Sequence, residues 1–254
     1  MMKILLKIAY VGTGFCGYQV QKDKITVQGC LCEAARAVFG CECDITGCSR
    51  TDSGVHANEF FATLTARDGR DIASAIPLDK LPIALSSHLP NGVSVTEAGL
   101  VDKGFHARYD VLYKEYIYKV WNAPIKNPFL EGFAYHLPHA LKADAIERMN
   151  EAAALFLGEH DFASFMAQGS NVASTVRNIK YFNVTKDGPL LTFSVAADGF
   201  LYNMVRIMVG TLLDVGRGKT EPCEISKMIE AADRRASGPT APACGLYLNR
   251  VVYK

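Results

Sequence analysis

A long alternating segment, Val111–Trp121, constrains the fold of this chain more than any other stretch. Side chains of an extended chain point alternately to the two faces of a sheet, so this period of two predicts a long strand. The chain must therefore build a sheet around it. The residues that share one face are Leu112, Lys114, Tyr116, Tyr118 and Val120.

Segments of both kinds, with the period of strands and with the period of helices, surround this strand. Further strands are predicted at residues 3–10, 43–48, 59–65, 93–101, 176–186, 190–197 and 246–253. Helices are predicted at residues 27–39, 143–157, 200–215 and 224–233, with short helical pieces interrupted by prolines at 71–90. Because strands and helices do not alternate strictly and Asp187-Gly188 indicates a hairpin, the sequence predicts an α+β fold with a largely antiparallel sheet.

Capping residues mark three helix ends. Thr26 is a suitable first cap for the helix at residues 27–39, and Gly40 is a suitable stop. Gly158 is predicted to stop the helix at residues 143–157 in the same way.

The chain divides into two halves of similar order, each running strand, loop, helix and strand, with a hinge near residues 100–110. We expect an N-terminal half at residues 1–105 and a C-terminal half at residues 106–254.

Charge and composition limit the classes of function only weakly. The chain has 27 Lys and Arg against 26 Asp and Glu, so a nucleic-acid surface would need its cations gathered on one face. The N-terminus lacks the features of a signal peptide, and no stretch approaches about 18 uninterrupted apolar residues, which favours a cytoplasmic protein. The eight cysteines include no Cys-x-x-Cys pair, which argues against zinc, and without a secretion signal disulfides are not expected.

The polar loop from Ser49 to His56 carries the densest set of chemically active groups. Asp52 lies in it beside Arg50, and a nearby cation together with backbone donors would keep the carboxylate ionised. An ionised, positioned carboxylate can act as a covalent nucleophile. Spacing alone favours the plainer alternative, a polar turn in which Asp52 and Ser53 bond their own backbone.

Arg206 and Tyr116 are two further candidates. Arg206 falls in the middle of the apolar helix predicted at residues 200–215, which implies either an anionic partner or a side chain whose head reaches water. Tyr116 is, on local pattern, an ordinary sheet aromatic. The histidines show no metal-ligand spacing, and the glycine-rich stretch at residues 12–17 matches no nucleotide-binding motif.

These pieces together resemble the tRNA pseudouridine synthase A family. The stretch from Gly47 to Ala57 is similar to that family's G-x-G-R-T-D-A-G-V-H-A loop, with Ser49 and Ser53 in place of small residues. Residues 10–21 resemble its Y-D-G-T-x-F-x-G-W-Q-x-Q, with Val11 for Asp and Tyr18 for Trp. Further ordered matches are Phe105-His106-Ala107-Arg108, Lys114-x-Tyr116-x-Tyr118, Asp161-Phe162-Ala163-Ser164-Phe165, Met204-Val205-Arg206 with Val209-Gly210, and Gly245-Leu246-Tyr247-Leu248.

The resemblance implies a pseudouridine synthase fold, with two similar halves around a central cleft, and a mechanism. Asp52 would be the nucleophile that attacks C6 of the base or C1′ of the ribose, Arg206 would pair with it, and Tyr116 would stack on the base. The N-terminal half would carry the Asp52 loop, and the C-terminal half would complete the cleft. Arg50, His56, Arg108 and Lys114 would contact the substrate, and neither a cofactor nor a metal would be needed.

The resemblance also implies partners: the anticodon arm of tRNA at the conventional positions 38, 39 and 40, and a second copy of the chain in a homodimer. A basic cleft shared by the two copies would let a near-neutral chain bind RNA. Besides Arg108 and Lys114, the candidate cations for this cleft are Arg177, Arg217, Lys219, Arg234 and Arg235.

Two alternative functions remain open from the sequence. A non-catalytic RNA-binding relative would keep the fold but not the reaction, and the intact set of Asp52, Tyr116 and Arg206 argues against it. A hydrolase with an aspartate nucleophile would need a metal or phosphate site, and no motif for either is present.

Overall fold

The structure is a computed structural model that describes residues 2–72, 75–169 and 172–254. Its chain forms two compact units, one of Met1–Leu112 with Leu248–Lys254 and the other of Tyr113–Tyr247. The proposed division into domains at residues 1–105 and 106–254 stays a prediction.

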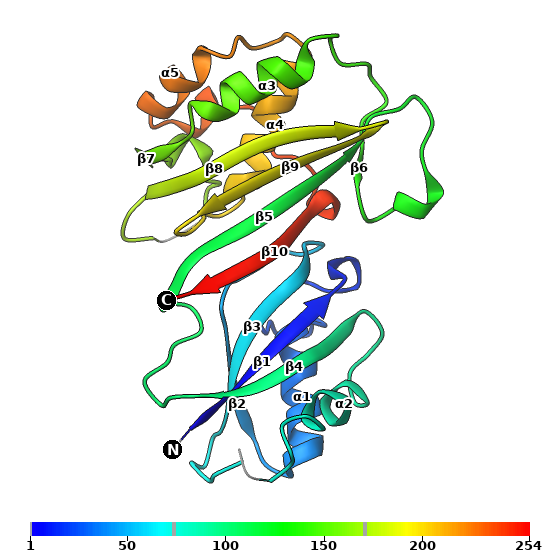
Figure 1. Ribbon diagram of the computed structural model, residues 1–254, viewed down its shortest axis with the longest axis vertical. Helices are drawn as coiled ribbons and strands as arrows, with labels where there is room; N and C mark the ends of the chain where they lie inside the picture. Colours follow the sequence, from blue (N-terminus) through cyan, green and yellow to red (C-terminus); the bar gives the residue numbers. More distant parts are fainter. Residues whose placement is uncertain (1, 73–74, 170–171) are drawn as a thin grey trace. The chain divides into compact units, whose positions relative to one another are not determined.

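The first unit is built on an antiparallel sheet whose strands follow the order β4-β1-β3, with β2 also paired to β3 and β10 next to β3 (Figure 1). Every second residue of β1 is buried, so one face of this sheet forms the core. The strands are β1 (Lys3–Tyr10), β2 (Cys43–Gly47), β3 (His56–Ala66), β4 (Val93–Val101) and β10 (Leu246–Tyr253).

Two helices, α1 (Val27–Phe39) and α2 (Leu81–Ser86), belong to this unit. The caps predicted for α1 are confirmed: the Thr26 hydroxyl accepts from the Gly29 N–H, and Gly40 takes the left-handed conformation at φ 65°. The region predicted as short helical pieces yields α2, and residues 73–74 lie outside the described part of the chain. Pro82 stands in the first turn of α2, where a proline is tolerated.

The second unit contains a sheet of strand order β5-β9-β8-β7, antiparallel throughout, with the short β6 parallel to β5. The α+β class with largely antiparallel pairing, predicted from the sequence, is therefore confirmed. The strands are β5 (Val111–Trp121), β6 (Tyr135–His136), β7 (Gly158–Asp161), β8 (Val176–Asp187) and β9 (Leu190–Ala197).

Three helices, α3 (Ala145–Ala154), α4 (Met204–Gly216) and α5 (Glu224–Glu230), gather beside this sheet (Figure 1). Each is shorter than predicted. Helix α4 begins after Asn203, whose φ of 59° is left-handed, and Ala232 at φ 48° prevents α5 from continuing. Gly158 does not stop α3, because α3 ends at Ala154 and Gly158 starts β7.

Short 3₁₀ turns complete the described elements. They are η1 (Gly12–Gly14), η2 (Pro128–Leu130), η3 (Ala163–Phe165), η4 (Arg234–Ala236) and η5 (Ala243–Gly245).

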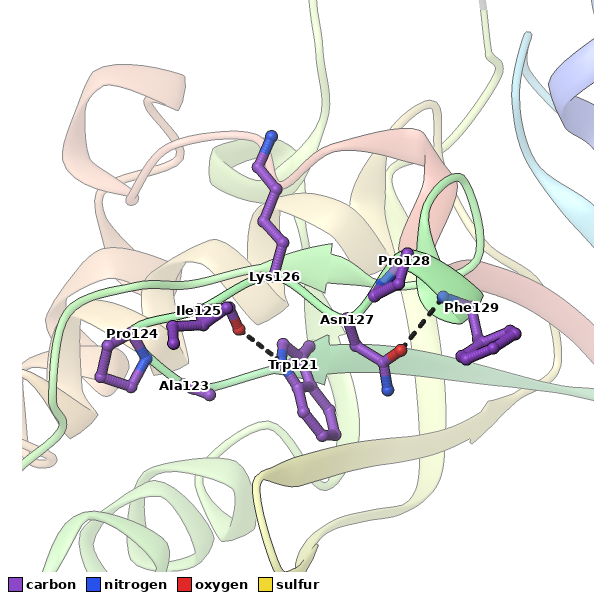
Figure 2. A pocket seen from close by; sticks show the side chains of 8 residues that line it. All are labelled: Trp121, Ala123, Pro124, Ile125, Lys126, Asn127, Pro128 and Phe129. Atoms are coloured by element: carbon purple, nitrogen blue, oxygen red, sulfur yellow. Dashed lines mark hydrogen bonds between the residues drawn. The ribbon is translucent and has the colours of Figure 1, made fainter.

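The loop that follows β5 is tied back on itself (Figure 2). The Trp121 indole N–H donates to the Ile125 carbonyl at 3.0 Å, and the Asn127 side chain accepts from the Phe129 N–H at 3.0 Å. Prolines 124 and 128 fix two further backbone angles. This loop therefore has a defined shape although much of it is exposed.

Helix α4 packs unusually close to the segment at residues 238–241. A Cβ added at Gly210 would lie 1.8 Å from the Pro239 carbonyl oxygen. The Thr211 hydroxyl accepts from the Gly238 N–H at 3.0 Å one residue further along. The absence of a side chain at Gly210 is thus what lets the segment reach the helix.

We predict that Gly210→Ala lowers the free energy of unfolding by about 1–3 kcal/mol, measured by urea denaturation. Helix propensity alone would make the alanine variant more stable than the parent by about 1 kcal/mol. A loss of unfolding free energy would therefore report the clash of the new Cβ with the Pro239 carbonyl. Gly99→Ala in β4 is the control, because nothing lies within 4 Å of a Cβ added there. A Gly210→Ala variant as stable as the parent would show that the segment does not need this contact.

Candidate active site

Asp52 opens a tight turn between β2 and β3. Its carbonyl accepts a hydrogen bond from the Val55 N–H at 3.1 Å, and Gly54, at φ 81°, supplies the positive angle that the third residue of a type II turn needs. A turn is therefore present here, as local spacing favoured, but the Ser53 hydroxyl donates to the Phe15 carbonyl and not to the backbone of the turn. The turn and the candidate nucleophile are one feature, because the turn fixes the backbone that carries the carboxylate.

Two glycines of the stretch at residues 12–17 pack directly against the backbone of this turn. A Cβ at Gly12 would lie 2.0 Å from the Val55 carbonyl oxygen, and a Cβ at Gly17 would lie 2.7 Å from the Thr51 carbonyl oxygen. The Tyr18 N–H also donates to the Thr51 carbonyl at 3.1 Å. The glycine-rich stretch, which matches no nucleotide motif, thus serves close approach of one backbone to another.

His56 lies beneath the turn and not on its surface. Its side chain is buried at 1% exposure, and Nδ1 accepts a hydrogen bond from the Gly12 N–H at 3.1 Å. Accepting at Nδ1 assigns the ring proton to Nε2. Strand β3 begins at His56, three residues before the predicted start at Glu59. This position suits a residue that holds the loop, and its predicted contact with substrate stays a prediction.

Side-chain hydrogen bonds fix the flanks of Asp52. The Thr51 hydroxyl, buried at 7% exposure, bonds the Tyr10 hydroxyl at 2.7 Å, and the Ser53 hydroxyl donates to the Phe15 carbonyl at 3.2 Å. Asp52 itself is half-buried, and Arg50 is exposed. A carboxylate on a fixed backbone with access to solvent is the arrangement that a positioned nucleophile requires.

Tyr18 packs under the same loop in an apolar setting. Its ring centroid lies 4.3 Å from that of Phe60, and its side chain is buried at 2% exposure. Within the described residues its hydroxyl has no hydrogen-bond partner, and burial raises the pKa of this phenol well above its ordinary value. The ring contributes packing here, and the hydroxyl contributes an uncompensated desolvation cost.

In the second unit, β5 buries the predicted face from Lys114 onward. Tyr116 is 6% exposed, and its ring meets Phe200 edge to face at 5.0 Å between centroids. Tyr118 is fully buried and donates from its hydroxyl to the Pro242 carbonyl at 2.7 Å. Lys114 is buried at 8% exposure, which is rare for a lysine and calls for interaction partners.

Arg206 stands in the first turn of α4, not in the middle of a helix as predicted. Its Nε donates to the Ala241 carbonyl at 2.7 Å and its Nη1 to the Asn203 side chain at 2.6 Å. The Ala241 N–H returns a bond to the Arg206 carbonyl at 3.0 Å. A helix N-terminus disfavours cations, so these hydrogen bonds offset an unfavourable interaction of the guanidinium with the helix dipole.

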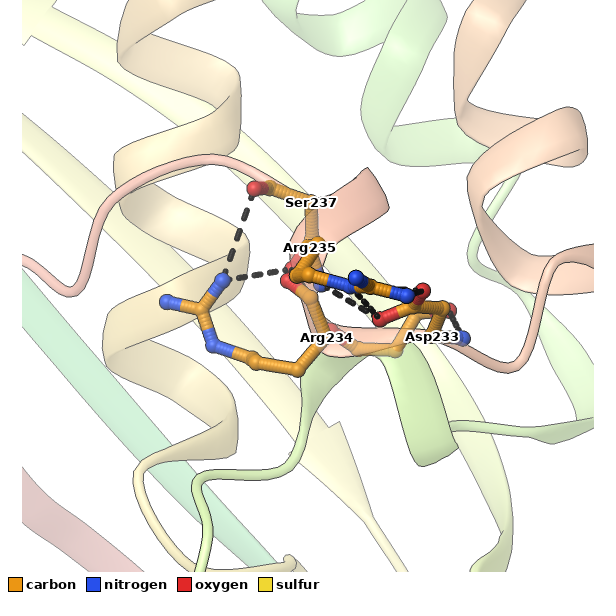
Figure 3. A network of polar contacts seen from close by, with 5 residues as sticks. Asp233, Arg234, Arg235 and Ser237 are labelled. Atoms are coloured by element: carbon orange, nitrogen blue, oxygen red, sulfur yellow. Dashed lines mark hydrogen bonds and ion pairs between the residues drawn. The ribbon is translucent and has the colours of Figure 1, made fainter.

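The segment that receives Arg206 is itself braced by polar contacts (Figure 3). Arg234 donates to the Ser237 hydroxyl at 3.0 Å and to the Thr240 hydroxyl at 3.1 Å. Arg235 pairs with Asp233 at 2.7 Å, and this hydrogen bond lowers the pKa of that carboxyl. Both arginines therefore have structural partners, and their predicted contact with RNA stays a prediction.

The other predicted cations are also engaged locally. Arg217 and Lys219 both approach Asp214, at 3.1 and 3.8 Å, and Arg177 donates to the Ser174 carbonyl at 3.0 Å. The exposed Arg108 lies 5.9 Å from the centroid of the Tyr109 ring. The predicted site residues thus divide by unit: Arg50, Asp52, His56 and Arg108 belong to the first, and Lys114, Tyr116, Arg177, Arg206, Arg217, Lys219, Arg234 and Arg235 to the second.

The eight cysteines are free thiols. Cys41, Cys43 and Cys48 are buried, and burial together with Cys41 raises the pKa of Cys43 to about 12, which keeps that thiol protonated. Among residues 2–72, 75–169 and 172–254, no group of three or more His, Cys, Asp or Glu is arranged to hold a metal. No helix in the described part of the chain has the length and apolar character to cross a membrane.

Two comparisons of the sequence with known proteins give the same family name. A family model described as tRNA pseudouridine synthase matches residues 152–254. The tRNA pseudouridine synthases A of Caldicellulosiruptor bescii and Brevibacillus brevis are each 41% identical to this chain over the full length of both proteins. That of Geobacillus kaustophilus is 42% identical over 97% of this chain and 93% of its own. A solved Cbf5-Nop10-Gar1 complex gives only a weak structural likeness, at a TM-score of 0.36 and 11% identity over 96% of this chain and 57% of that one.

Two tyrosine hydroxyls near the Asp52 turn should behave oppositely when removed. Tyr10→Phe leaves the buried Thr51 hydroxyl without this partner and should cost about 1–3 kcal/mol of unfolding free energy. Tyr18→Phe removes a hydroxyl with no partner among the described residues and should be neutral or stabilising by up to about 1 kcal/mol. Urea denaturation of both variants tests the pair, and an equal loss in both would contradict the assigned hydrogen bonding.

Proposed function

We infer, from the premise that this chain belongs to the tRNA pseudouridine synthase A family, that it is an isomerase converting uridine to pseudouridine in tRNA. Membership rests on relatives about 40% identical along the whole chain. We further propose that Asp52 is the nucleophile.

The main observation that supports Asp52 as the nucleophile is the fixed turn in which it lies. Gly12 and Gly17 support the backbone on one side, and buried Thr51 and His56 anchor the neighbouring residues, while the carboxylate stays half-exposed. Holding a reacting group in place lowers a barrier by removing the entropy of positioning it. This support is the physical reason to prefer Asp52 over other carboxylates of the chain.

The reaction itself is an internal exchange. The target uridine leaves its stack, at a cost of a few kcal/mol, and contacts to the backbone and to the base offset that cost. Asp52 attacks either C6 of the base or C1′ of the ribose, and the bond that its carboxylate forms there breaks again before the product leaves, so the free carboxylate is regenerated. The bond from C1′ to N1 breaks, the uracil turns, and a bond from C1′ to C5 forms. A proton leaves C5 and N1 gains one, so no oxidant, reductant or second substrate is consumed.

Two residues of the second unit are proposed as further catalytic groups. Tyr116 offers a positioned aromatic ring for stacking on the base and a hydroxyl that could help remove the C5 proton, a role supported by its fixed contact with Phe200. Arg206 offers a cation held where the helix dipole disfavours one. Its proposed role is to stabilise negative charge during the reaction. Substrate contacts of Arg50, His56, Arg108 and Lys114 belong to the same proposal.

We propose the anticodon arm, at positions 38, 39 and 40, as the target, and a cytoplasmic homodimer as the working form. The resemblance of the ordered motifs along the whole chain supports both. A homodimer would also let two near-neutral chains share a basic surface for one tRNA.

The direct test is Asp52→Asn. We expect the rate of pseudouridine formation in tRNA, mapped by mass spectrometry, to fall about 10³-fold or more, while the circular dichroism spectrum and the affinity for tRNA change little. Asp102→Asn, at an exposed aspartate in the same unit, is the control and should keep full activity.

Three outcomes separate the possible functions. Full activity of Asp52→Asn would remove Asp52 from the mechanism. Parent protein that binds tRNA but modifies no tRNA would favour the non-catalytic RNA-binding relative. Activity at tRNA positions other than 38, 39 and 40 would be consistent with the proposed reaction. It would show that the proposed target positions are wrong.

A further inference from the structure

The turn between β4 and β5 carries two aromatic rings that stack on one another at the surface of the first unit. The ring centroids of His106 and Tyr109 lie 4.2 Å apart, and the ring planes are 34° from parallel. Tyr109 is nevertheless 70% exposed, so His106 covers one face of the tyrosine ring and leaves the rest open to solvent. We call His106, Arg108 and Tyr109 the ring platform.

Hydrogen bonds fix the backbone of the ring platform. The His106 Nδ1 atom accepts from the Arg108 N–H at 3.1 Å and from the Tyr109 N–H at 3.3 Å. The His106 N–H donates to the Asp110 carboxylate at 2.8 Å, and the Asp110 N–H donates to the His106 carbonyl at 3.1 Å. A single exposed aromatic residue is ordinary on a protein surface. A pair of rings on a backbone that is fixed before binding is different, because it loses little entropy when a ligand docks.

The last residues of β10 hold the same turn from the other side. The Tyr253 hydroxyl donates to the Ala107 carbonyl at 2.8 Å. The ring centroid of Tyr253 also lies 5.0 Å from that of Phe105. The residues next to the ring platform are therefore anchored to the sheet, while the Tyr109 ring itself stays exposed.

The ring platform and the Asp52 turn lie at opposite ends of β1. The first residue of the strand, Lys3, donates from its side chain to the Phe105 carbonyl at 2.9 Å, next to the ring platform. The chain beyond the last residue of β1 meets the Asp52 turn at Gly12. Eight residues at about 3.3 Å each separate the two places by roughly 25 Å. The ring platform is therefore not a part of the candidate active site.

An aromatic ring with an open face and a cation beside it can bind an unstacked base of a nucleic acid. Every base has a flat face that stacks on tyrosine, whatever the sequence. The guanidinium carbon of Arg108 lies 5.9 Å from the centroid of the Tyr109 ring, near the outer limit of a cation–π contact. This exposed guanidinium is therefore available to a phosphate beside the stacked base.

RNA fits these groups better than an apolar protein surface does. An apolar partner that covered the Tyr109 ring would also take the Arg108 charge out of water, and burying an unpaired charge is costly. RNA supplies a flat base for the ring and a phosphate for the charge at the same time. Loops of RNA, moreover, contain unpaired bases, which are the ones that proteins stack on aromatic side chains.

We propose that the ring platform binds an unpaired nucleotide of the tRNA substrate, with the base stacked on the open face of Tyr109 and the adjoining phosphate bound by Arg108. Because the ring platform lies roughly 25 Å from the Asp52 turn, this nucleotide is not the target uridine. The contact selects and holds the tRNA and takes no part in the reaction. The inference rests on the proposed function, since it takes tRNA as the substrate.

Binding of an unmodified tRNA transcript, measured by fluorescence anisotropy, tests the proposal. Tyr109→Ala should raise the Kd about 5- to 100-fold, whereas Tyr109→Phe keeps the ring and should bind like the parent. Ile83→Ala is the matched control, because Ile83 is also 70% exposed and lies on α2 of the same unit. All three variants should keep the parental melting temperature. Parental affinity in folded Tyr109→Ala would overturn the proposal and leave the ring to a contact with protein.

The salt dependence of binding separates the stacking contact from the phosphate contact. Arg108→Gln removes one phosphate contact, so the slope of log Kd against log salt concentration should fall by about 0.7–0.9. Tyr109→Ala should keep the parental slope, because stacking releases no counterion. A parental slope in Arg108→Gln would contradict the phosphate contact, and a reduced slope in Tyr109→Ala would contradict stacking.

Tryptophan fluorescence reports on the stacking itself. The parent chain has one tryptophan, Trp121, so the emission gained in Tyr109→Trp comes from residue 109. An indole ring that stacks on a base loses fluorescence, so saturating tRNA should quench this added emission. Added emission that tRNA does not quench would overturn the stacking contact.

Turnover distinguishes a failure of this proposal from a failure of the proposed function. In Tyr109→Ala the KM for tRNA should rise together with the Kd, while the rate at saturating tRNA stays close to that of the parent. A parent chain that neither binds nor modifies tRNA would overturn the ring platform and the proposed function together. A parent chain that modifies tRNA, with the same KM in Tyr109→Ala, would overturn the ring platform alone.

Discussion

The close approach of two glycine backbones to the Asp52 turn is the constraint on which the candidate site depends. No residue with a Cβ fits at Gly12 or Gly17 without moving Val55 or Thr51. The sheet supplies the platform, because β1 leads into Gly12 and β3 begins directly after the turn. In the first unit, the antiparallel sheet and the two glycines together fix the backbone that carries the Asp52 carboxylate.

In the second unit too, a glycine allows two backbone segments to approach closely. Gly210 lets the segment at residues 238–241 reach α4, and Arg206 then bonds that segment through both its side chain and its backbone. In each unit, a proposed catalytic residue lies on a backbone that is fixed by close packing, and a glycine makes that packing possible. Asp52 and Arg206 are half-buried, whereas Tyr116, Lys114 and His56 are buried.

The sequence predicted the regular elements well and their ends less well. The period of two gave β5 and the capping residues gave α1, because both signals are local. The start of α4 and the end of α5 depended on left-handed angles at Asn203 and Ala232, which no periodicity reports. The glycine-rich stretch matches no nucleotide-binding motif, and its support of the Asp52 turn is a long-range contact that a single sequence does not contain. The proposed roles of Asp52 and Arg206 came from ordered motif resemblance and not from local chemistry.

Single-turnover formation of pseudouridine by Gly12→Ala tests most directly whether the close packing of Gly12 and Gly17 against the turn positions Asp52. A Cβ at Gly12 must displace the Val55 backbone, and misplacement by about 1 Å can cost about 10²-fold in rate. Gly14→Ala, where nothing lies within 4 Å of the new Cβ, is the control in the same loop. The account predicts a loss of about 10²-fold for folded Gly12→Ala with tRNA affinity nearly unchanged, and parental rates for Gly14→Ala. Parental rates for both variants would contradict it.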